Sequence, residues 1–367
     1  MKQSLGYAND RSVYNALNQS KLTSKKIQEL FLRKGILCSS DTDRDALSSY
    51  FSRLTHDFFD HKFIANSIGV IPRREKITST EIIAKDNNSL SHSDIKTILK
   101  DVEAKLNFEG CIVKYKTSNN EQELEITYTE IDYSRTDFQQ MITRTGKISV
   151  DSEKEVIHIR STQAKFINEV KENLVLQLIS LDKNNLKKNV INLSTFDIPD
   201  MRTQFFLETI RNIDEYELEE ISQVGLYKNK NLFGGDVDIE ENEEATIGNI
   251  NDAHLKGNAV HLTPELKLLS EKGFYYVKVI STLKGKKDNL LYTVDIEFKD
   301  KENCEEFSYI VKHINEPKYD PETKSLTSYK SPRAPKPSEQ INFIDKLEKS
   351  AKNSFVKINQ SINPYSL

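Results

Sequence analysis

Residues 22–54, LTSKKIQELFLRKGILCSSDTDRDALSSYFSRL, contain the most specific pattern in the chain. Ser24 is a good helix N-cap, and apolar residues recur every three or four positions from Ile27 to Phe31. Gly35 comes where a glycine in the left-handed conformation commonly ends a helix. A short polar link over 39–42 then precedes a second apolar face over 46–54. The stretch predicts two short amphipathic helices that are joined by a tight loop and pack face to face.

Basic residues remain on the predicted outer surface of this helical pair. They are Lys25, Lys26, Arg33, Lys34, Arg44 and Arg53. Lysine and arginine side chains neutralise nucleic-acid phosphates, and this neutralisation supplies most of the non-specific affinity for DNA. The pattern therefore predicts a DNA-binding surface without strong sequence preference.

The layout resembles the SAP domain, a small helix–loop–helix module found in many DNA-binding proteins. The resemblance rests on Leu22, Ser24, Ile27 to Lys34, Gly35-Ile36 and Arg53-Leu54. The family usually has a loop glycine, and in its place this chain has the acidic residues Asp41, Asp43 and Asp45. The resemblance covers only residues 22–54 and implies DNA binding there. The alternative is an amphipathic helical pair that packs on the next domain.

A third amphipathic segment from Phe58 to Gly69 extends the expected helical unit to residues 1–72, before a break at Pro72-Arg73-Arg74. The start of this helical segment carries His56, Asp57, Asp60 and His61, but these residues lack the spacing of known zinc motifs. We therefore expect a solvated polar face here and no metal site.

Composition places the chain among soluble proteins. Charged residues make up 29% of the sequence, and no run approaches the roughly 18 apolar residues of a membrane-spanning helix. The first residues lack an apolar signal core, so we expect a cytoplasmic protein with no membrane partner. Cys38, Cys111 and Cys304 are too scattered for a disulfide framework or a thiolate metal site.

Charge is distributed unevenly along the chain, although the net charge is only −4. Residues 1–80 hold 13 Lys/Arg against 8 Asp/Glu, and residues 214–252 hold 2 against 12. Basic ends around an acidic middle are typical of chains that contact nucleic acid or an acidic partner, and they also occur in ordinary Lys- and Glu-rich proteins.

The middle of the chain predicts an α+β fold with antiparallel sheets. A helix over 93–106, strand-like runs at 111–116, 124–133, 141–150 and 156–160, and a helix over 162–181 indicate one domain over 93–185. A second domain over 186–315 is expected to contain helices at 200–212 and 214–224, an acidic loop at 234–252 and a helix that begins at Thr263-Pro264.

A predicted hairpin of strands 274–283 and 290–299 follows that last helix. Its tip carries Lys284, Lys286 and Lys287. A helix followed by a hairpin with a basic tip looks like the recognition helix and wing of a winged-helix domain, which would contact the DNA backbone. The hairpin is therefore a second candidate DNA contact.

The strand at 290–299 also suggests an enzymatic alternative. Asp295, Glu297 and Lys299 alternate on one of its faces, and a Glu-x-Lys strand is common at metal-dependent nuclease sites. Such a site needs another acid on a neighbouring strand, and residues 274–283 contain none. Alternating charge on a half-exposed strand explains the pattern without chemistry.

The C-terminal region predicts a flexible linker over 316–337 and an amphipathic helix over 338–358. The apolar stripe of this helix includes Ile341, Ile344, Leu347 and Phe355. A single helix does not cover its own apolar face, so the stripe must meet the body of the protein, a second copy or another protein. We expect it to bind a protein partner.

These patterns favour a non-enzymatic DNA-binding and assembly protein without cofactors. Richness in Lys, Asn, Ile and Ser suggests an AT-rich bacterial or phage genome, and hence a subunit of a nucleic-acid-directed complex such as an antiviral defence system. The alternatives are a metal-dependent nuclease and an oligomeric scaffold with no nucleic-acid role.

Overall fold

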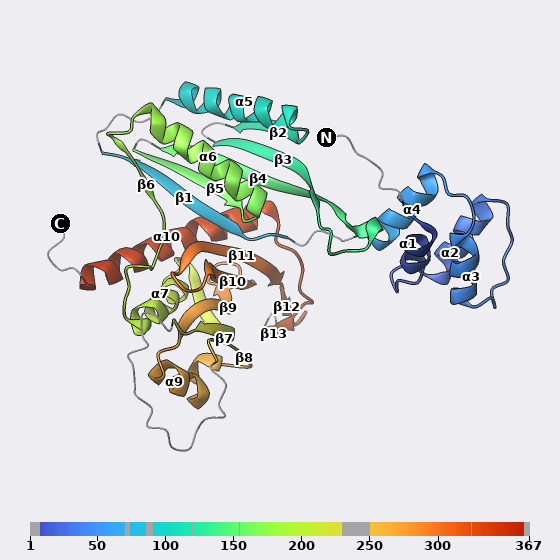
Figure 1. Ribbon diagram of the computed structural model, residues 1–367. Coiled ribbons are helices and arrows are strands. Elements are labelled where there is room, and N and C mark those ends of the chain that lie inside the picture. The colour runs from blue at the N-terminus through green and yellow to red at the C-terminus, as the bar shows by residue number, and fades with distance from the viewer. Residues whose placement is uncertain are drawn as a thin grey trace, which may run out of the picture. The chain divides into compact units, whose positions relative to one another are not determined.

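The computed structural model describes residues 8–69, 74–85, 91–118, 121–153, 155–229, 250–323 and 325–362 (Figure 1). The chain divides into two compact units. The first comprises Met1–Arg74, Asn88–Glu153 and Glu169–Leu181, and the second comprises Glu75–Asn87, Lys154–Asn168 and Asp182–Leu367. The fold is α+β, with N-terminal helices, a large amount of antiparallel sheet and a C-terminal helix, as the sequence predicts.

The N-terminal part of the first unit is helical. Its helices are α1 (Asp10–Leu17), α2 (Ser24–Arg33), α3 (Arg44–Ser52) and α4 (Phe58–Ile68). Asp43 caps α3, and Asp57 and Asp60 form a capping box at the start of α4. Apolar residues from all four helices form one buried core, with Phe31 and Phe51 at its centre. The helices expected within residues 1–72 are therefore present, and they share their compact unit with residues 88–153 and 169–181.

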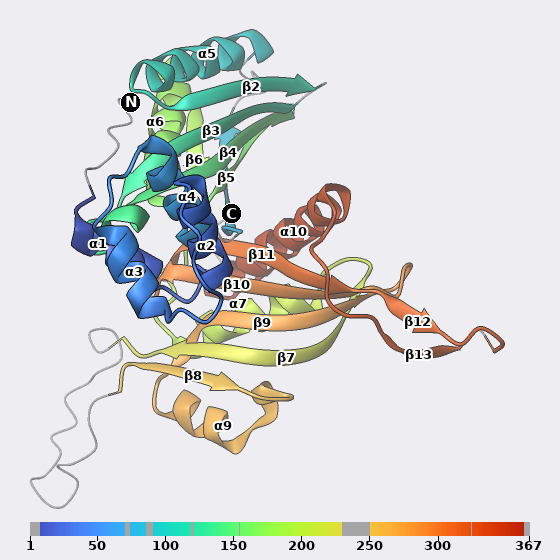
Figure 2. The same cartoon turned by 90° about the vertical axis from the view of Figure 1, so that its right-hand side faces the viewer.

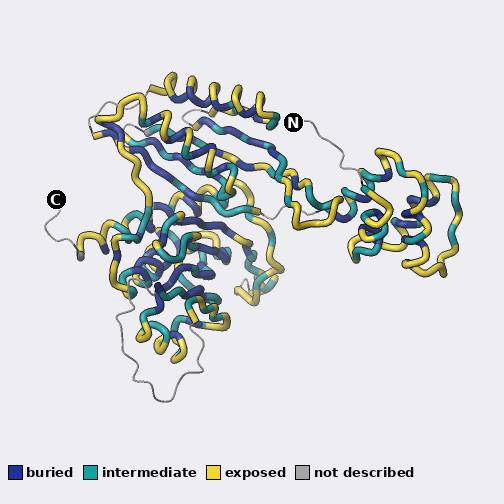
Figure 3. Tube along the Cα trace, viewed as in Figure 1, coloured by how far each residue is buried: buried dark blue, intermediate teal, exposed yellow. Residues whose placement is uncertain are grey.

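The rest of the first unit contains an antiparallel three-stranded ladder and helices. The strands β2 (Ile112–Ser118), β3 (Glu121–Ile131) and β4 (Met141–Glu153) pair in that order. Helix α5 (His92–Phe108) packs on β2 and β3, and α6 (Lys165–Leu181) contributes residues 169–181. Figure 3 shows that one side of α5 is buried and that the opposite side is exposed.

A short turn between β3 and β4 joins the helical part to this ladder. It contains the 3₁₀ helix η1 (Asp137–Gln139). The Gln139 amide donates a 2.9 Å hydrogen bond to the Ile68 carbonyl, and the Phe138 ring lies 5.5 Å from that of His61. The helical part is thus anchored within its unit.

The second unit is built on one antiparallel sheet. Its strands, in spatial order, are β5 (Val156–Thr162), β1 (Ile77–Ala84), β11 (Glu305–Asn315), β10 (Leu291–Asp300), β9 (Tyr275–Gly285), β7 (Tyr216–Tyr227) and β8 (Asp252–Lys256). A further strand, β6 (Leu186–Asn189), pairs with the end of β1. Strands far apart in the sequence are neighbours here, because Ile77 of β1 lies opposite Tyr309 of β11.

Two helices pack on one face of this sheet and close the main core. They are α7 (Pro199–Arg211) and α10 (Pro337–Ile362), which are visible against the strands in Figure 2. Phe205 and Phe206 of α7 and Phe343 of α10 are fully buried among strand residues. The Ser350 hydroxyl of α10 donates a 2.7 Å hydrogen bond to the Thr209 carbonyl of α7. The shorter α9 (Pro264–Glu271) adds Leu266 to the same core.

The prediction of a helix at 214–224 is wrong, because this segment lies in strand β7. The pairing of β7 with β9 shifts register at Leu218/Glu220, Ile221/Gln223 and Gly225/Leu226. The first two bulges add a residue to β7 and change its apolar spacing from two to three, whereas the third adds a residue to β9. The bulges therefore gave the strand a helix-like periodicity.

The winged-helix interpretation is also wrong for the hairpin at 274–299. Strand β9 pairs with β7 as well as with β10, and β10 pairs with β11 as well as with β9. Both strands therefore lie in the interior of the large sheet, whereas a wing is a projecting hairpin.

The segment expected to be a flexible linker, 316–337, is instead structured. It contains the antiparallel pair β12 (Pro317–Tyr319) and β13 (Leu326–Tyr329), and Arg333 forms a backbone bridge to Ile314 of β11. The Arg333 guanidinium also contacts Glu316 and Glu339 at 2.7 Å each, which ties both ends of the segment to its neighbours. Of the other expected features, Pro72-Arg73 and most of the acidic loop at 234–252 lie outside the described residues.

Candidate functional site

Helices α2 and α3 run side by side in the same direction. At their starts, the Arg44 guanidinium of α3 donates a 2.5 Å hydrogen bond to the Leu22 carbonyl, and at their ends the Lys34 ammonium lies 2.6 Å from the Thr55 carbonyl. Gly35 ends α2 with a φ of +74°, as its position predicts. Because the helices are parallel, the connection between them returns along their length and is longer than the expected tight loop.

Three of the basic residues predicted to meet DNA have partners inside the helical part. Arg33 pairs with Glu29 at 2.8 Å and lies over the Phe63 ring, 4.4 Å from its centroid. The Lys34 ammonium lies 2.6 Å from the buried carboxylate of Asp60. Arg44 donates hydrogen bonds to the carbonyls of Leu17, Gln19 and Leu22. These cations stabilise the helical part, so a phosphate would have to compete with existing partners.

The other three basic residues have no carboxylate within 4.0 Å among the residues that the structure describes. Lys25 and Lys26 lie in the first turn of α2, and Arg53 ends α3. No side chain caps the start of α2 through a hydrogen bond, and its first turn contains no acid. Backbone N–H groups and two ammonium groups therefore lie close together at this helix start, an arrangement that favours an anion.

The lysines at the β9–β10 turn are mostly neutralised. Lys287 forms an ion pair with Glu215, and the Lys284 ammonium lies 4.0 Å from a carboxylate oxygen of Glu219. Lys286 is exposed, and its backbone N–H donates to the Glu215 carbonyl. Glu215 and Glu219 belong to the turn and strand beside the hairpin, so this tip presents little free positive charge.

The nuclease candidates on β10 form a neutral cluster. Lys76 contacts Asp295 at 2.5 Å and Glu297 at 2.9 Å, and Lys278 of β9 contacts the same two carboxylates at 3.2 and 3.0 Å. Lys299 lies outside this cluster, because its ammonium pairs with Glu306 at 3.4 Å. The described residues contain no group of three His, Cys, Asp or Glu side chains that could hold a metal ion.

Burial lowers the pKa values of the two lysines in this cluster, and the neighbouring carboxylates raise them. Burial lowers the pKa of Lys76 more than Asp295 and Glu297 raise it, so its pKa is below the ordinary value. Lys278 is less buried, and the same two carboxylates raise its pKa despite the cost of burial. Two acids and two lysines balance one another, which makes the cluster an ion-pair network in the sheet. Lys76 lies far from β10 in the sequence, and its contact with Asp295 has no sequence signal.

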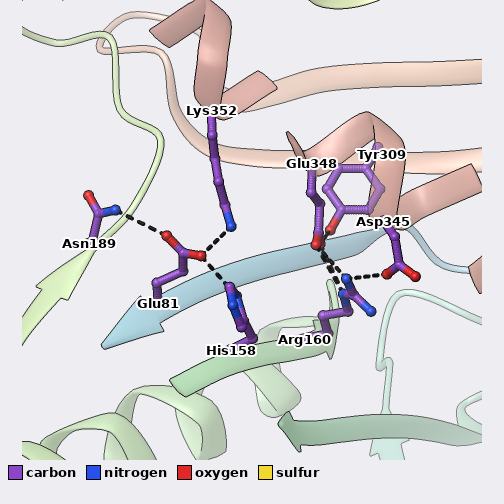
Figure 4. Close-up of polar contacts among 8 residues, drawn as sticks. All are labelled: Glu81, His158, Arg160, Asn189, Tyr309, Asp345, Glu348 and Lys352. Atoms are coloured by element: carbon purple, nitrogen blue, oxygen red, sulfur yellow. Dashed lines mark hydrogen bonds and ion pairs between the residues drawn. The ribbon is translucent and has the colours of Figure 1, made fainter. Parts of the chain in front are cut away.

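A second set of ion pairs joins α10 to the sheet (Figure 4). Glu81 of β1 accepts a 2.8 Å contact from Nδ1 of His158 on β5 and a 3.1 Å hydrogen bond from the Asn189 amide, and it pairs with Lys352 of α10. Burial alone would raise the pKa of Glu81, but the hydrogen bonds and charges of His158 and Lys352 lower its pKa to about 2. The carboxylate is therefore ionised at neutral pH.

A neighbouring cluster on the same face is centred on Arg160 of β5. Its guanidinium contacts Glu348 at 2.7 Å and Asp345 at 2.6 Å, both on α10. The Tyr309 hydroxyl of β11 donates to Glu348 as well, and burial together with this carboxylate raises the pKa of Tyr309 well above its usual value. Sequence reasoning identified neither cluster, because all of these contacts join residues more than 30 positions apart.

The predicted partner-binding stripe of the C-terminal helix is covered by the protein's own core. Ile344 and Leu347 are buried against α7 and the sheet, and Phe355 packs at the edge of the same core. Ile341 is 53% exposed and lies on the outer side of α10. The prediction that this stripe binds another protein is therefore corrected, because the strands and α7 already supply the apolar surface that it needs.

No known protein-family model matches this chain, and its sequence matches no curated protein. None of the described helices is both long enough and apolar enough to cross a membrane.

Proposed function

We propose that this protein is a non-enzymatic DNA-binding protein that contacts the phosphate backbone through cations at both ends of the α2–α3 pair, Lys25 and Lys26 at the start of α2 and Arg53 at the end of α3. The observation that carries the proposal is that these three cations have no described carboxylate within 4.0 Å, whereas the other basic residues of the helical pair have internal partners. Phosphates would supply the missing negative charge.

The buried core of the helical part supports this role. Apolar residues from α1 to α4 fill that core, so Lys25, Lys26 and Arg53 do not contribute to its packing. The start of α2 adds backbone N–H groups that suit a phosphate oxygen. Because these contacts involve the backbone of DNA, we expect binding without strong sequence preference.

The test is fluorescence anisotropy with a labelled DNA duplex at several salt concentrations. The slope of log K against log salt is about −0.9 for each phosphate contact. We expect the triple variant Lys25→Ala, Lys26→Ala, Arg53→Ala to bind more weakly and to have a flatter slope. The matched control removes Lys96, Lys100 and Lys105 from α5, another helix of the first unit. An equal loss of DNA affinity in both triple variants would mean that the attraction comes from overall charge, and it would overturn the assignment of the contact to Lys25, Lys26 and Arg53.

We also propose that the protein acts within a larger nucleic-acid-directed bacterial complex. Leu37, Phe108 and Tyr133 of the first unit are exposed apolar side chains, and they are the motive for this proposal. A pull-down from native extract with and without nuclease treatment tests this part. Partners that remain after nuclease treatment would support the complex, and an unaccompanied protein would contradict it.

The nuclease alternative has less support than DNA binding, because Lys76 and Lys278 neutralise Asp295 and Glu297. The scaffold alternative is an outcome of the DNA-binding test. It would replace our proposal if the wild-type protein bound no DNA.

A further inference from the structure

Three aromatic side chains near the α3–α4 corner are exposed to solvent. Phe58 is 47% exposed, Phe59 is 68% exposed and Tyr50 is 54% exposed. None of them belongs to the buried core of the helical part, as far as the structure describes that core. Phe58 and Phe59 are in ring contact with each other, and Tyr50 lies in the last turn of the preceding helix. Exposed aromatic rings at neighbouring positions of the fold favour a surface that meets a ligand.

The geometry of these rings leaves their surfaces open for stacking on a ligand. Phe58 and Phe59 open α4, with ring centroids 5.4 Å apart and an interplanar angle of 83°. Tyr50 is stacked on the buried Phe31 at 5.7 Å with an interplanar angle of 19°, so the core supports one side of its ring. Aromatic rings held in this way are suited to stack on other flat, delocalised groups.

Positive charge accompanies these rings. Lys62 is exposed, and its ammonium lies 5.6 Å from the centroid of the Phe58 ring. Arg53 ends α3 just before the corner and has no described carboxylate within 4.0 Å. Of the local acids, Asp60 pairs with Lys34 at 2.6 Å, and Asp57 accepts the Asp60 N–H at 2.8 Å while keeping its charge. The corner therefore offers aromatic rings together with two cations, Arg53 and Lys62, that pair with no carboxylate among the described residues.

We propose that this aromatic corner, defined as Tyr50, Arg53, Phe58, Phe59 and Lys62, binds unpaired bases of single-stranded nucleic acid. The rings stack on successive bases, and Arg53 and Lys62 contact the phosphates between them. Every base has a π face, so such binding tolerates any sequence. The inference deepens the proposed function and rests on it, because it assigns single-stranded segments to the same helical part.

Charge complementarity favours this occupant over an apolar protein surface. A purely apolar partner would bury Arg53 and Lys62 without compensation, and unpaired buried charge is costly. A single strand supplies both a stacking surface and a phosphate for each nucleotide. The source of the strand, DNA or RNA, is decided by using both as probes.

The decisive variant is Phe59→Trp. The chain contains no tryptophan, so the introduced indole would be the only one and its fluorescence would report on this site alone. We expect oligothymidylate or oligouridylate to quench this fluorescence by stacking. A duplex of the same length and an abasic oligonucleotide should leave it nearly unchanged. A Leu268→Trp variant, on the exposed side of α9 in the second unit, is the matched control and should not respond.

A second variant measures affinity. Phe58→Ala, Phe59→Ala should weaken binding of oligothymidylate by about 10- to 100-fold, because stacking is worth about 1–3 kcal/mol per base. Its affinity for duplex and abasic DNA should stay within about threefold of wild type. Phe108→Ala, which removes another exposed ring, is the matched control. An unchanged melting temperature in each variant will show that folding is intact.

The outcomes separate the inference from the proposed function. If duplex DNA binds but the indole of Phe59→Trp is not quenched and the double alanine variant keeps its single-strand affinity, the inference fails and the proposed function stands. If no nucleic acid binds, both fail. Quenching of the same indole by a protein from extract, with no response to oligonucleotides, would assign the corner to a protein partner and would also overturn the inference.

Discussion

Glu81→Gln is the sharpest test of how α10 is held on the sheet. Glu81 is the shared acceptor of the cluster that joins β1, β5, β6 and α10. The amide keeps the size of the carboxylate but removes its charge, so Lys352 loses its counterion and His158 loses a charged hydrogen-bond partner. The change therefore isolates the electrostatic part of the contact from its packing.

The magnitude follows from the pKa of Glu81. Its carboxyl pKa is lowered from 4.5 to about 2, and at 1.36 kcal/mol per pKa unit this corresponds to about 3 kcal/mol in favour of the charged form. The Lys352 side chain is 33% exposed, so solvent screens part of this attraction. We expect the free energy of unfolding of the second unit to fall by about 2 kcal/mol.

The assay is urea unfolding followed by far-ultraviolet circular dichroism at a series of pH values. A lowered carboxyl pKa gives stability that is fully present above the unfolded pKa and is lost as pH falls through the folded pKa. The difference between wild type and Glu81→Gln should therefore be constant above about pH 4.5 and shrink toward about pH 2. By about pH 3 it should have fallen by roughly half.

Hydrogen exchange adds a local measurement. Amides of β1 and β5 should exchange faster in Glu81→Gln, whereas Glu271→Gln, at the exposed end of α9, should change neither measurement. A difference that stays the same from neutral pH to pH 3 would refute the electrostatic argument. So would a loss of stability smaller than about 0.5 kcal/mol, the usual size of a surface effect.

Two further predictions follow from the second unit. Leu347→Ala should lower the free energy of unfolding by about 2–5 kcal/mol, because this side chain is 1% exposed in the core, whereas Ile341→Ala should lower it by under about 0.5 kcal/mol. Thermal unfolding measures both variants, and equal effects would mean that α10 is not docked as described. Millimolar Mg²⁺ should not raise the melting temperature of the wild type or support DNA cleavage, because Lys76 and Lys278 already neutralise Asp295 and Glu297. DNA cleavage that disappears in Glu297→Ala, with folding intact, would restore the nuclease interpretation.

Local signals in the sequence predicted most of the helices and hairpins. Thr263-Pro264 marked the start of α9, and Gly35 marked the end of α2. Long-range pairing was not predictable, because nothing near Ile77 indicates that its neighbours are Thr162 and Tyr309. The candidate DNA surface was only partly predictable for the same reason. The sequence indicates which residues are basic, but Asp60 and Glu29 decide which of those cations are already paired.

The C-terminal helix shows how a correct local pattern led to a wrong conclusion about its partner. An apolar stripe indicates that one face of a helix is covered, but not by what. The charged residues of α10 indicate where the helix docks. Glu348 is only 5% exposed, and a buried carboxylate requires a nearby cation. Arg160 of β5 supplies that cation, and Glu81 performs the reciprocal role for Lys352. Moving α10 onto another protein would therefore leave Arg160 and Glu81 without their partners in addition to uncovering the core. The apolar stripe stabilises the contact, whereas the ion pairs select the sheet of this chain as its site.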